Sequence, residues 1–334
     1  SVALVIACAF FAALSGSAPA TVVAIGSMLY ADMVKQGYPE DRTAGLLVIA
    51  GGLGPVIPPS IIMVLYCTLT GASVTNMFSQ GMVIGILIMI VLILEALYYA
   101  HKEKWPKAET KHTAGEIGKI FLEAVPALLT PVIILGGIYS GKFTPTEAAV
   151  ISVVYSYIVG RFVYKELDNK GVYKALRDTI VINGSTTFMV GLSSASSYVI
   201  TTSGLPQQLV SFFSSITNSP VVILLLLNIL FLIIGMLMEA NAAVVMMTPI
   251  LLPLLNAFGI DLLQFGIVMS FNLCIGLVTP PVGLCLLLCN QTGETRLSHS
   301  LKAMMPMLLI SIIVLFLITY VSPLTTLLPS IMAG

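Results

Sequence analysis

Residues 51–60 read Gly-Gly-Leu-Gly-Pro-Val-Ile-Pro-Pro-Ser and interrupt an apolar segment that runs from about residue 44 to about residue 69. Proline lacks an amide donor and clashes with the preceding helical turn, and glycine loosens a helix further. The segment therefore predicts a helix that is broken in its middle. If it crosses a membrane, the freed carbonyls and amides need protein or a water-filled cavity beside them, because lipid cannot satisfy them.

A second break has the same form. Residues 276–283, Gly-Leu-Val-Thr-Pro-Pro-Val-Gly, interrupt an apolar run from about residue 265 to residue 288. The two regions align without gaps at an offset of 222 residues, which pairs Gly37 with Gly259, Gly54 with Gly276, Pro58 with Pro280 and Pro59 with Pro281. Paired structural kinks are the alternative, but two breaks in register favour an internal duplication with a shared site, as in secondary transporters.

The composition is that of a membrane protein. Hydrophobic residues make up 57% of the 334 residues and charged residues 9%, whereas soluble domains carry about 25% charge. The apolar runs are continuous and lack the alternation of β-barrel strands. We therefore expect an all-α polytopic membrane protein. The formal net charge of +0 gives no reason to expect a nucleic-acid partner.

Cysteine and histidine give no sign of a metal centre or of catalysis. The five cysteines lie in apolar runs without metal-ligand spacing, which favours buried packing: Cys8, Cys67, Cys274, Cys285 and Cys289. The three histidines, His101, His112 and His299, lie in or near polar segments. Neither His-Glu-x-x-His nor Gly-x-Ser-x-Gly occurs. An intramembrane hydrolase is therefore disfavoured, and we expect no cofactor.

Residues 1–30 predict a helical hairpin. Two apolar arms flank the small polar tip Leu14-Ser-Gly-Ser-Ala-Pro-Ala-Thr21. Each arm is shorter than the ~20 residues needed to cross a bilayer, so a re-entrant hairpin is predicted. The alternative is a single kinked helix that packs through its small residues.

Residues 221–258 repeat this pattern around the tip Met238-Glu-Ala-Asn-Ala242. Glu239 is the only charged residue between Asp178 and Asp261. An acidic residue inside an apolar run is a candidate functional site. The alternative is a tip carboxylate that reaches water or caps a helix.

The remaining spans set the expected topology. Further spans are predicted near residues 77–100, 120–140, 147–164, 179–202 and 303–328. Basic residues gather in segments 101–119 and 161–178, which the positive-inside rule places in the cytoplasm. Counting from these segments, the first hairpin enters from the cytoplasm and the second from outside. Opposite topology is the signature of inverted repeats.

This topology divides the chain into four parts. We expect a first transport repeat at 1–76, scaffold helices at 77–178, a second transport repeat at 179–290 and a C-terminal scaffold helix at 291–334. The sequence opens in an apolar run without a starting methionine, so we expect an N-terminal segment to precede it.

The breaks and hairpin tips supply the candidate site residues. Na⁺ prefers oxygen ligands, and broken-helix carbonyls and hydroxyls provide them. The predicted Na⁺ ligands are Ser15, Ser17, Gly54, Val56, Pro58, Asn241, Gly276, Val278 and Thr279. The half-helices that begin at Pro59 and Pro281 point amino-terminal dipoles toward an anion. The predicted substrate-binding residues are Ser17, Pro59, Ser60, Ser185, Glu239, Asn241 and Pro281.

Six short segments together resemble the large membrane subunit of tripartite ATP-independent periplasmic (TRAP) transporters, of the DctM/SiaM type: residues 15–21, 54–60, 144–148, 238–241, 259–261 and 279–283. The resemblance covers essentially the whole chain, but the family's subunit usually begins with further helices. It implies a Na⁺-coupled importer of organic acids, such as C4-dicarboxylates or sialic acid, in the bacterial inner membrane. It also implies an elevator mechanism.

The resemblance implies two partners: a small four-helix membrane subunit (Q-type) and an extracytoplasmic substrate-binding protein (P-type). The rival interpretations are a proton-coupled organic-anion carrier that uses Glu239 without a binding protein, a passive channel, and a membrane enzyme. Uptake that depends on both Na⁺ and a binding protein would distinguish the Na⁺-coupled importer from these rivals.

Overall fold

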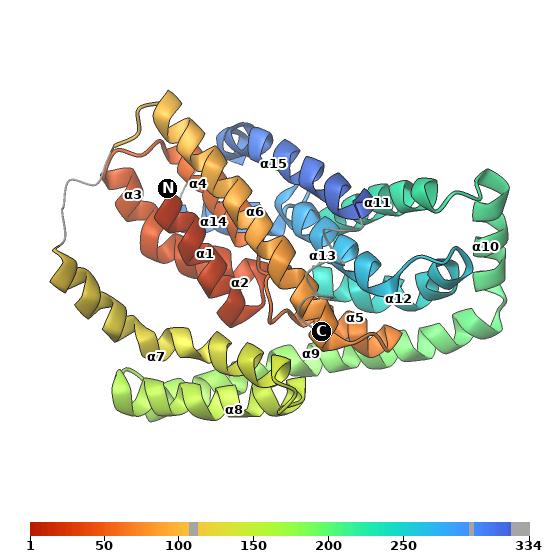
Figure 1. Ribbon diagram of the computed structural model, residues 1–334, viewed down its shortest axis with the longest axis horizontal. Coiled ribbons are helices and arrows are strands. Elements are labelled where there is room, and N and C mark those ends of the chain that lie inside the picture. Colours follow the sequence, from red (N-terminus) through yellow and green to blue (C-terminus); the bar gives the residue numbers. More distant parts are fainter. Residues whose placement is uncertain (107–112, 294–296, 322–334) are drawn as a thin grey trace. The chain divides into compact units, whose positions relative to one another are not determined.

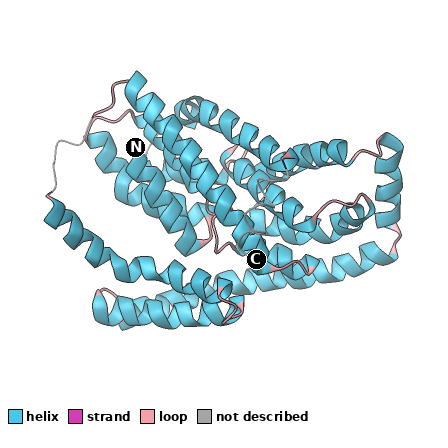
Figure 2. Ribbon diagram, in the orientation of Figure 1, coloured by secondary structure: helices cyan, strands magenta, loops and turns pink. Residues whose placement is uncertain are grey.

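The computed structural model describes residues 1–106, 113–293 and 297–321, and these residues form helices without any strand (Figure 2). Six of the described helices are long and apolar enough to cross a bilayer, judged by length and composition. They include the predicted spans near residues 77–100, 120–140 and 147–164. The all-α, polytopic prediction is therefore confirmed.

The chain forms two compact units, residues 1–106 with 190–334 and residues 107–189. These two units do not coincide with the four predicted parts, whose boundaries follow residues 76, 178 and 290. The four parts were defined by transport and scaffold roles, and they stay predictions. Some predicted features fall outside the described residues: His112 with part of segment 101–119, part of the polar connection at 291–302, and the end of the span at 303–328.

The first half of the larger unit contains six α-helices and one π-helix: α1 (Val2–Ser15), α2 (Ala18–Ile25), η1 (Gly26–Tyr30), α3 (Ala31–Lys35), α4 (Glu40–Gly51), α5 (Ile61–Thr70) and α6 (Val74–Lys102). Helices α1 and α2 pack against each other and both pack on α4 (Figure 1). Helix α1 ends at Gly16, whose φ of 61° is left-handed and whose amide bonds to the carbonyl of Ala12. This turn sends the chain back along α1 as the predicted hairpin.

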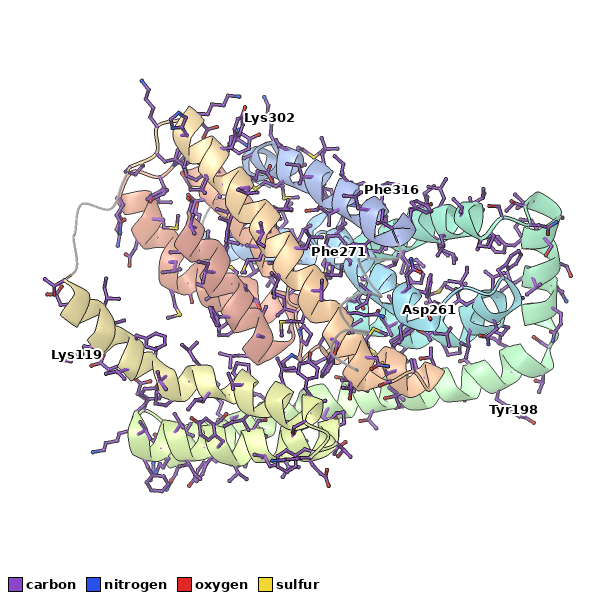
Figure 3. The ribbon with its side chains drawn as sticks, in the orientation of Figure 1. Lys119, Tyr198, Asp261, Phe271, Lys302 and Phe316 are labelled. Atoms are coloured by element: carbon purple, nitrogen blue, oxygen red, sulfur yellow. The ribbon has the colours of Figure 1, made fainter. Side chains whose placement is uncertain are left out.

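The second half of this unit contains α10 (Leu205–Ile216), α11 (Pro220–Leu237), α12 (Ala240–Ala257), α13 (Leu262–Val278), α14 (Leu284–Gly293) and α15 (Leu297–Tyr320). Figure 3 shows Asp261 beside the start of α13, where its carboxylate accepts a hydrogen bond from the Gln264 amide at 2.7 Å and caps the helix. Helix α13 is the most central helix, because residues 265–278 are buried without interruption.

Helix boundaries in the two halves keep the 222-residue spacing found in the sequence. Three pairs of termini match: α1 and α11 end at Ser15 and Leu237, α2 and α12 begin at Ala18 and Ala240, and α4 and α13 begin at Glu40 and Leu262. The halves also exchange partners, since α2 packs on α14 and α12 packs on α5. Each hairpin's second arm therefore rests on the later half of the other half's broken helix.

The smaller unit contains α7 (Ala114–Tyr139), α8 (Pro145–Ile158), η2 (Val159–Val163) and the first part of α9 (Asn169–Thr202). Pro126 lies inside α7 and cannot continue its hydrogen-bond ladder. The hydroxyl of Tyr155 donates to the Pro126 carbonyl at 2.8 Å, and the hydroxyl of Tyr164 donates to the Glu123 carbonyl at 2.7 Å. These bonds hold α8 and η2 against the irregular part of α7.

Two expectations about membrane crossing stay predictions. Helix α9, which contains the predicted span at 179–202, is not among the six apolar helices. The side of the membrane from which the second hairpin enters was predicted by counting this span. Helices α11 and α12 have 18 residues each and are among the six, so length alone does not separate a re-entrant hairpin from two crossings. All five cysteines are buried, as expected for packing residues.

Candidate transport site at the two helix breaks

The first break is a buried loop between two helices. Helix α4 ends at Gly51, α5 begins at Ile61, and residues 51–58 are all buried. Ser60 closes the loop, because its hydroxyl donates to the Pro55 carbonyl at 2.6 Å and accepts from the Met63 amide at 3.4 Å. The second bond is the N-cap of α5.

The loop leaves three carbonyls without a recorded partner. Within the described residues, the carbonyls of Gly54, Val56 and Pro58 accept no hydrogen bond. The neighbouring Leu53 carbonyl, in contrast, accepts from the amides of Val56 and Ile57 at 2.9 and 3.1 Å. Buried carbonyls are normally paired. The three predicted Na⁺ ligands of this loop are therefore buried carbonyls that form no hydrogen bond within the described residues.

The first hairpin tip is a small hydroxyl cluster. The Ser17 carbonyl accepts from the Thr21 hydroxyl at 2.8 Å, the Thr21 amide at 3.1 Å and the Ser15 hydroxyl at 3.3 Å. The hydroxyls of Ser15 and Thr21 are also 3.2 Å apart. Sequence reasoning selected Ser15 and Ser17 but missed Thr21, although Thr21 lies one helical turn after Ser17, where a hydroxyl can reach back to its carbonyl.

The tip and the first break lie against each other. A Cβ atom added at Gly54 would lie 2.6 Å from the Ala18 amide nitrogen and 2.7 Å from the Ser17 carbonyl carbon. A Cβ atom added at Gly16 would lie 2.9 Å from the Pro59 carbonyl oxygen. Glycine is required at both positions because no side chain fits between the two backbones. The structure thus brings Ser17, Gly54 and Pro59 together.

The second hairpin tip carries a carboxylate and an amide. Glu239 is exposed and caps α12, since its carboxylate accepts from the Ala242 amide at 3.1 Å. The same carboxylate accepts from Asn241 Nδ2 at 2.9 Å. Among the described residues, the Asn241 Oδ1 atom is buried and has no hydrogen-bond partner. A buried amide oxygen in this position can accept from a ligand or coordinate a cation.

The second break is shorter and more open than the first. Helix α13 continues to Val278, and the Thr279 amide donates to the Gly276 carbonyl at 2.9 Å. The Thr279 hydroxyl donates back to the Ile275 carbonyl. Pro281 and the following Val282 are exposed. Of the predicted ligands here, Gly276 and Val278 lie in the last turn of α13, and the Gly276 carbonyl already accepts the Thr279 amide.

The two breaks approach each other in the centre of the larger unit. A Cβ atom added at Gly52 would lie 3.0 Å from Val278 Cγ1. A small apolar cavity of about 20 Å³ lies beside this contact and includes Phe271 and Ser311 in its lining. Ser185, another predicted binding residue, lies on α9 in the smaller unit, and its hydroxyl is 3.2 Å from the Val181 carbonyl.

A buried network of polar side chains joins α11, α13 and α15 in the second half of the larger unit. Asn272 Nδ2 on α13 donates to Asn228 Oδ1 on α11, and Asn228 Nδ2 donates to the Thr319 hydroxyl on α15 at 3.1 Å. Gln264 Nε2 donates to the Thr319 carbonyl at 2.9 Å. These side chains were not predicted from the sequence. Polar residues at single positions in apolar helices are the available signal, because such residues usually pair across helices.

Comparison with known proteins identifies the family. Residues 1–324 match the family described as the DctM component of tripartite ATP-independent periplasmic transporters. A C4-dicarboxylate TRAP transporter large permease of Pseudomonas aeruginosa is 39% identical over 99% of this chain and 77% of its own length. The sialic acid large permease SiaM of Vibrio cholerae is 33% identical over 99% of this chain and 77% of its own.

A fused relative adds information about organisation. The isethionate TRAP transporter permease DctMQ of Oleidesulfovibrio alaskensis is 36% identical over 94% of this chain, which covers 49% of that protein. Members of this family are secondary transporters of the inner membrane and are not enzymes. With a family match over nearly its whole length and six apolar helices, this chain belongs to the DctM component family, the large permeases of TRAP transporters.

Proposed function

We propose that this chain imports an organic acid with Na⁺ as the coupling ion, after an extracytoplasmic substrate-binding protein delivers the acid. The substrate class follows from relatives named for C4-dicarboxylates and sialic acid. The choice between these acids is left to experiment. The proposal rests mainly on one observation, the contact of the first hairpin tip with a buried loop in which the carbonyls of Gly54, Val56 and Pro58 accept no hydrogen bond within the described residues.

The first break suits a cation. The carbonyls of Gly54, Val56 and Pro58 in the loop and the hydroxyl of Ser15 in the hairpin tip are neutral oxygens. Hard cations prefer such oxygen ligands, and discontinuous helices in transporters use them for Na⁺. In the second half, we assign the corresponding role to Asn241, Thr279 and the carbonyls of Gly276 and Val278.

The anionic substrate would face helix amino termini. Helix α5 begins after Ser60 and α14 begins after Gly283. Free backbone amides and the helix dipole at such ends favour a carboxylate. We propose that Ser17, Pro59, Ser60, Glu239, Asn241 and Pro281 surround the acid, and that Ser185 contributes from the smaller unit.

We further propose inverted repeats and an elevator mechanism. The matching helix termini and the exchanged packing of α2 on α14 and α12 on α5 support a duplication. Helices α6 and α15 belong to the same compact unit as the breaks, and we propose for them the scaffold role that the sequence predicts for residues 77–178 and 291–334.

The proposed partners are a small Q-type membrane subunit and a P-type binding protein. The family implies both, and the fused DctMQ relative is consistent with a small subunit that works beside the large one. Exposed apolar residues on α7, α8 and η2, such as Phe121, Val153 and Phe162, leave the smaller unit with ample surface for lipid or a subunit.

Uptake into proteoliposomes tests the proposal. The chain would be reconstituted with its small subunit and supplied with a loaded binding protein, under an inward Na⁺ gradient or an equal K⁺ gradient. We expect uptake only when Na⁺ and binding protein are both present. Uptake that needs Na⁺ but no binding protein would support the ion site and refute delivery of the acid by a binding protein. Uptake indifferent to Na⁺ would refute the ion site and favour proton coupling through Glu239.

A further inference from the structure

A pocket lies between α6 and α15, away from both breaks. Its volume is about 310 Å³, and it is lined by Val91, Leu94, Glu95, Tyr98, Tyr99, Pro306 and Ile310. Both helices are candidate membrane spans and pack against each other (Figure 1). Six of the seven lining residues are apolar or aromatic. Glu95 is the exception, and the transport proposal gives it no role.

Glu95 has no partner for its carboxylate. The residue is 6% exposed, and in the described part of the chain neither carboxylate oxygen has a hydrogen-bond partner. Burial of an unpaired carboxylate is among the most costly arrangements in a protein. Such a group calls for a cation or a hydrogen-bond donor from outside the chain.

The nearest cation is already engaged. Arg42 interacts electrostatically with Glu95, but its hydrogen bonds go elsewhere. Its Nε and Nη2 atoms lie 3.1 and 3.0 Å from Glu103 Oε1, and its Nη1 atom donates to the Ala303 carbonyl at 2.6 Å. The guanidinium also lies over the Tyr99 ring, 4.1 Å from its centroid. Glu103 therefore balances Arg42 and leaves Glu95 without a direct partner.

The position of Glu95 along α6 indicates where a partner could come from. Helix α6 has 29 residues and is about 43 Å long, whereas the hydrocarbon core of a bilayer is about 30 Å thick. Glu95 is about 10 Å from the end of the helix at Lys102. If the surplus length is shared between both ends, Glu95 lies near the boundary between headgroups and hydrocarbon.

We propose that this pocket binds an aminophospholipid from the surrounding bilayer, with Glu95 as the anionic partner of the lipid ammonium group. An ammonium supplies three donors to a carboxylate that has none. The apolar lining, which includes Val91, Leu94 and Ile310, suits the lipid's hydrocarbon. Because the carboxylate oxygens are covered, binding includes rotation of the Glu95 side chain toward the opening.

The single tryptophan of the sequence reports on this pocket. Trp105 Nε1 donates to Glu103 at 2.9 Å, and Glu103 holds the Arg42 that covers Tyr99 in the lining. The chain would be reconstituted in vesicles that contain phosphatidylethanolamine or phosphatidylcholine with identical acyl chains, brominated near the glycerol end. Bromine quenches tryptophan emission at short range, so the ratio of quenching by the two lipids measures preference for the ammonium headgroup.

We expect phosphatidylethanolamine to quench about threefold more strongly, as for one partly screened ion pair. Glu95→Gln should lower the ratio to about one, whereas Glu123→Gln, on the candidate span α7, should leave it unchanged. Val91→Phe fills the pocket and keeps Glu95, so it should reduce the preference as well and provides a second variant if Glu95→Gln folds poorly. Equal quenching in the unaltered chain, or a preference that survives Glu95→Gln, would overturn the proposal.

Discussion

The two helix breaks share a sequence pattern but differ in how they are covered. The first break is buried, and the hairpin tip lies directly on it, as the close approach of Gly54 to Ser17 and Ala18 shows. The second break exposes Pro281 and Val282, and its hairpin tip is an exposed carboxylate. The two matching sequence patterns therefore specify similar helix breaks without specifying the same surroundings.

The two hairpins also contact their broken helices at different positions. At the 222-residue spacing, the counterpart of the Gly54 contact would join Gly276 to the backbone of Glu239 and Ala240. The closest backbone to Gly276 belongs instead to Gly235, four residues earlier on α11. Four residues are about one helical turn, or roughly 5–6 Å. The second hairpin thus meets Gly276 about one turn before its tip, whereas the first hairpin meets Gly54 at the tip itself.

The largest expected effect comes from Gly54. Gly54→Ala should destabilise the protein by about 1–3 kcal/mol through overpacking, and should reduce Na⁺-driven uptake at least tenfold, because the new methyl group separates the tip from the loop. Thermal unfolding in detergent and uptake in proteoliposomes measure the two effects. The control is Gly136→Ala, since nothing lies within 4 Å of a Cβ there. Equal behaviour of both variants would contradict the proposed tip contact.

Gly276→Ala tests where the second hairpin meets its broken helix. The added methyl group would collide with the backbone of Gly235, so we expect a loss of stability of about 1–3 kcal/mol. If the second hairpin instead slides by one turn to the arrangement of the first, the loss of stability will be smaller. That result would show that the two breaks differ only in this conformation, and that the second hairpin can adopt the arrangement of the first.

Thr279→Ala and Ser60→Ala separate function from stability. Ser60 caps α5, so its removal should cost about 1 kcal/mol with little change in the Na⁺ dependence of uptake. The Thr279 hydroxyl lies at the end of α13 and only returns to its own helix. Its removal should raise the half-saturating Na⁺ concentration several-fold with little loss of stability. Equal shifts in Na⁺ dependence, at matched expression, would count against Thr279 as a ligand.

The smallest expected effect is that of Glu239→Gln. Glutamine can still accept the Ala242 amide, so the cap of α12 should survive with a loss of less than about 1 kcal/mol. Uptake should still require Na⁺, because the proposed coupling ion binds neutral oxygens. Uptake assays at several pH values with equal Na⁺ on both sides provide the check. Loss of coupling in this variant, with Na⁺ removal harmless, would favour proton coupling.

Much of the fold was predictable because its signals are local. Proline and glycine break a helix wherever they occur, and the Pro-Pro pairs marked both breaks correctly. The paired glycines before α4 and α13, Gly37 and Gly259, have φ values of 90° and 64° in matching turns. The family was identifiable from six short motifs. The span near residues 179–202 was less secure, since α9 has many polar residues and is not counted among the apolar helices.

The site was predictable only in part. Ser15, Ser17 and Gly54 meet at one place, as the hairpin pattern suggested. Thr21 was missed, although it is completely buried and bonds to the tip. The network of Asn228, Asn272 and Thr319 was missed as well, because it joins three helices that are far apart in the sequence. No periodicity within one segment can reveal such a set.

The sequence by itself determined the membrane character and the positions of the two helix breaks, because hydropathy, proline and glycine act on the chain within a few residues. The tertiary structure decided which tip rests on which break, that α6 and α15 pack with the broken helices, and that the second hairpin meets Gly276 about one turn before its tip. These features depend on close approach between distant backbones, where a single glycine such as Gly54 or Gly235 sets the distance. Such a distance depends on the residues of both segments, so neither segment alone predicts it.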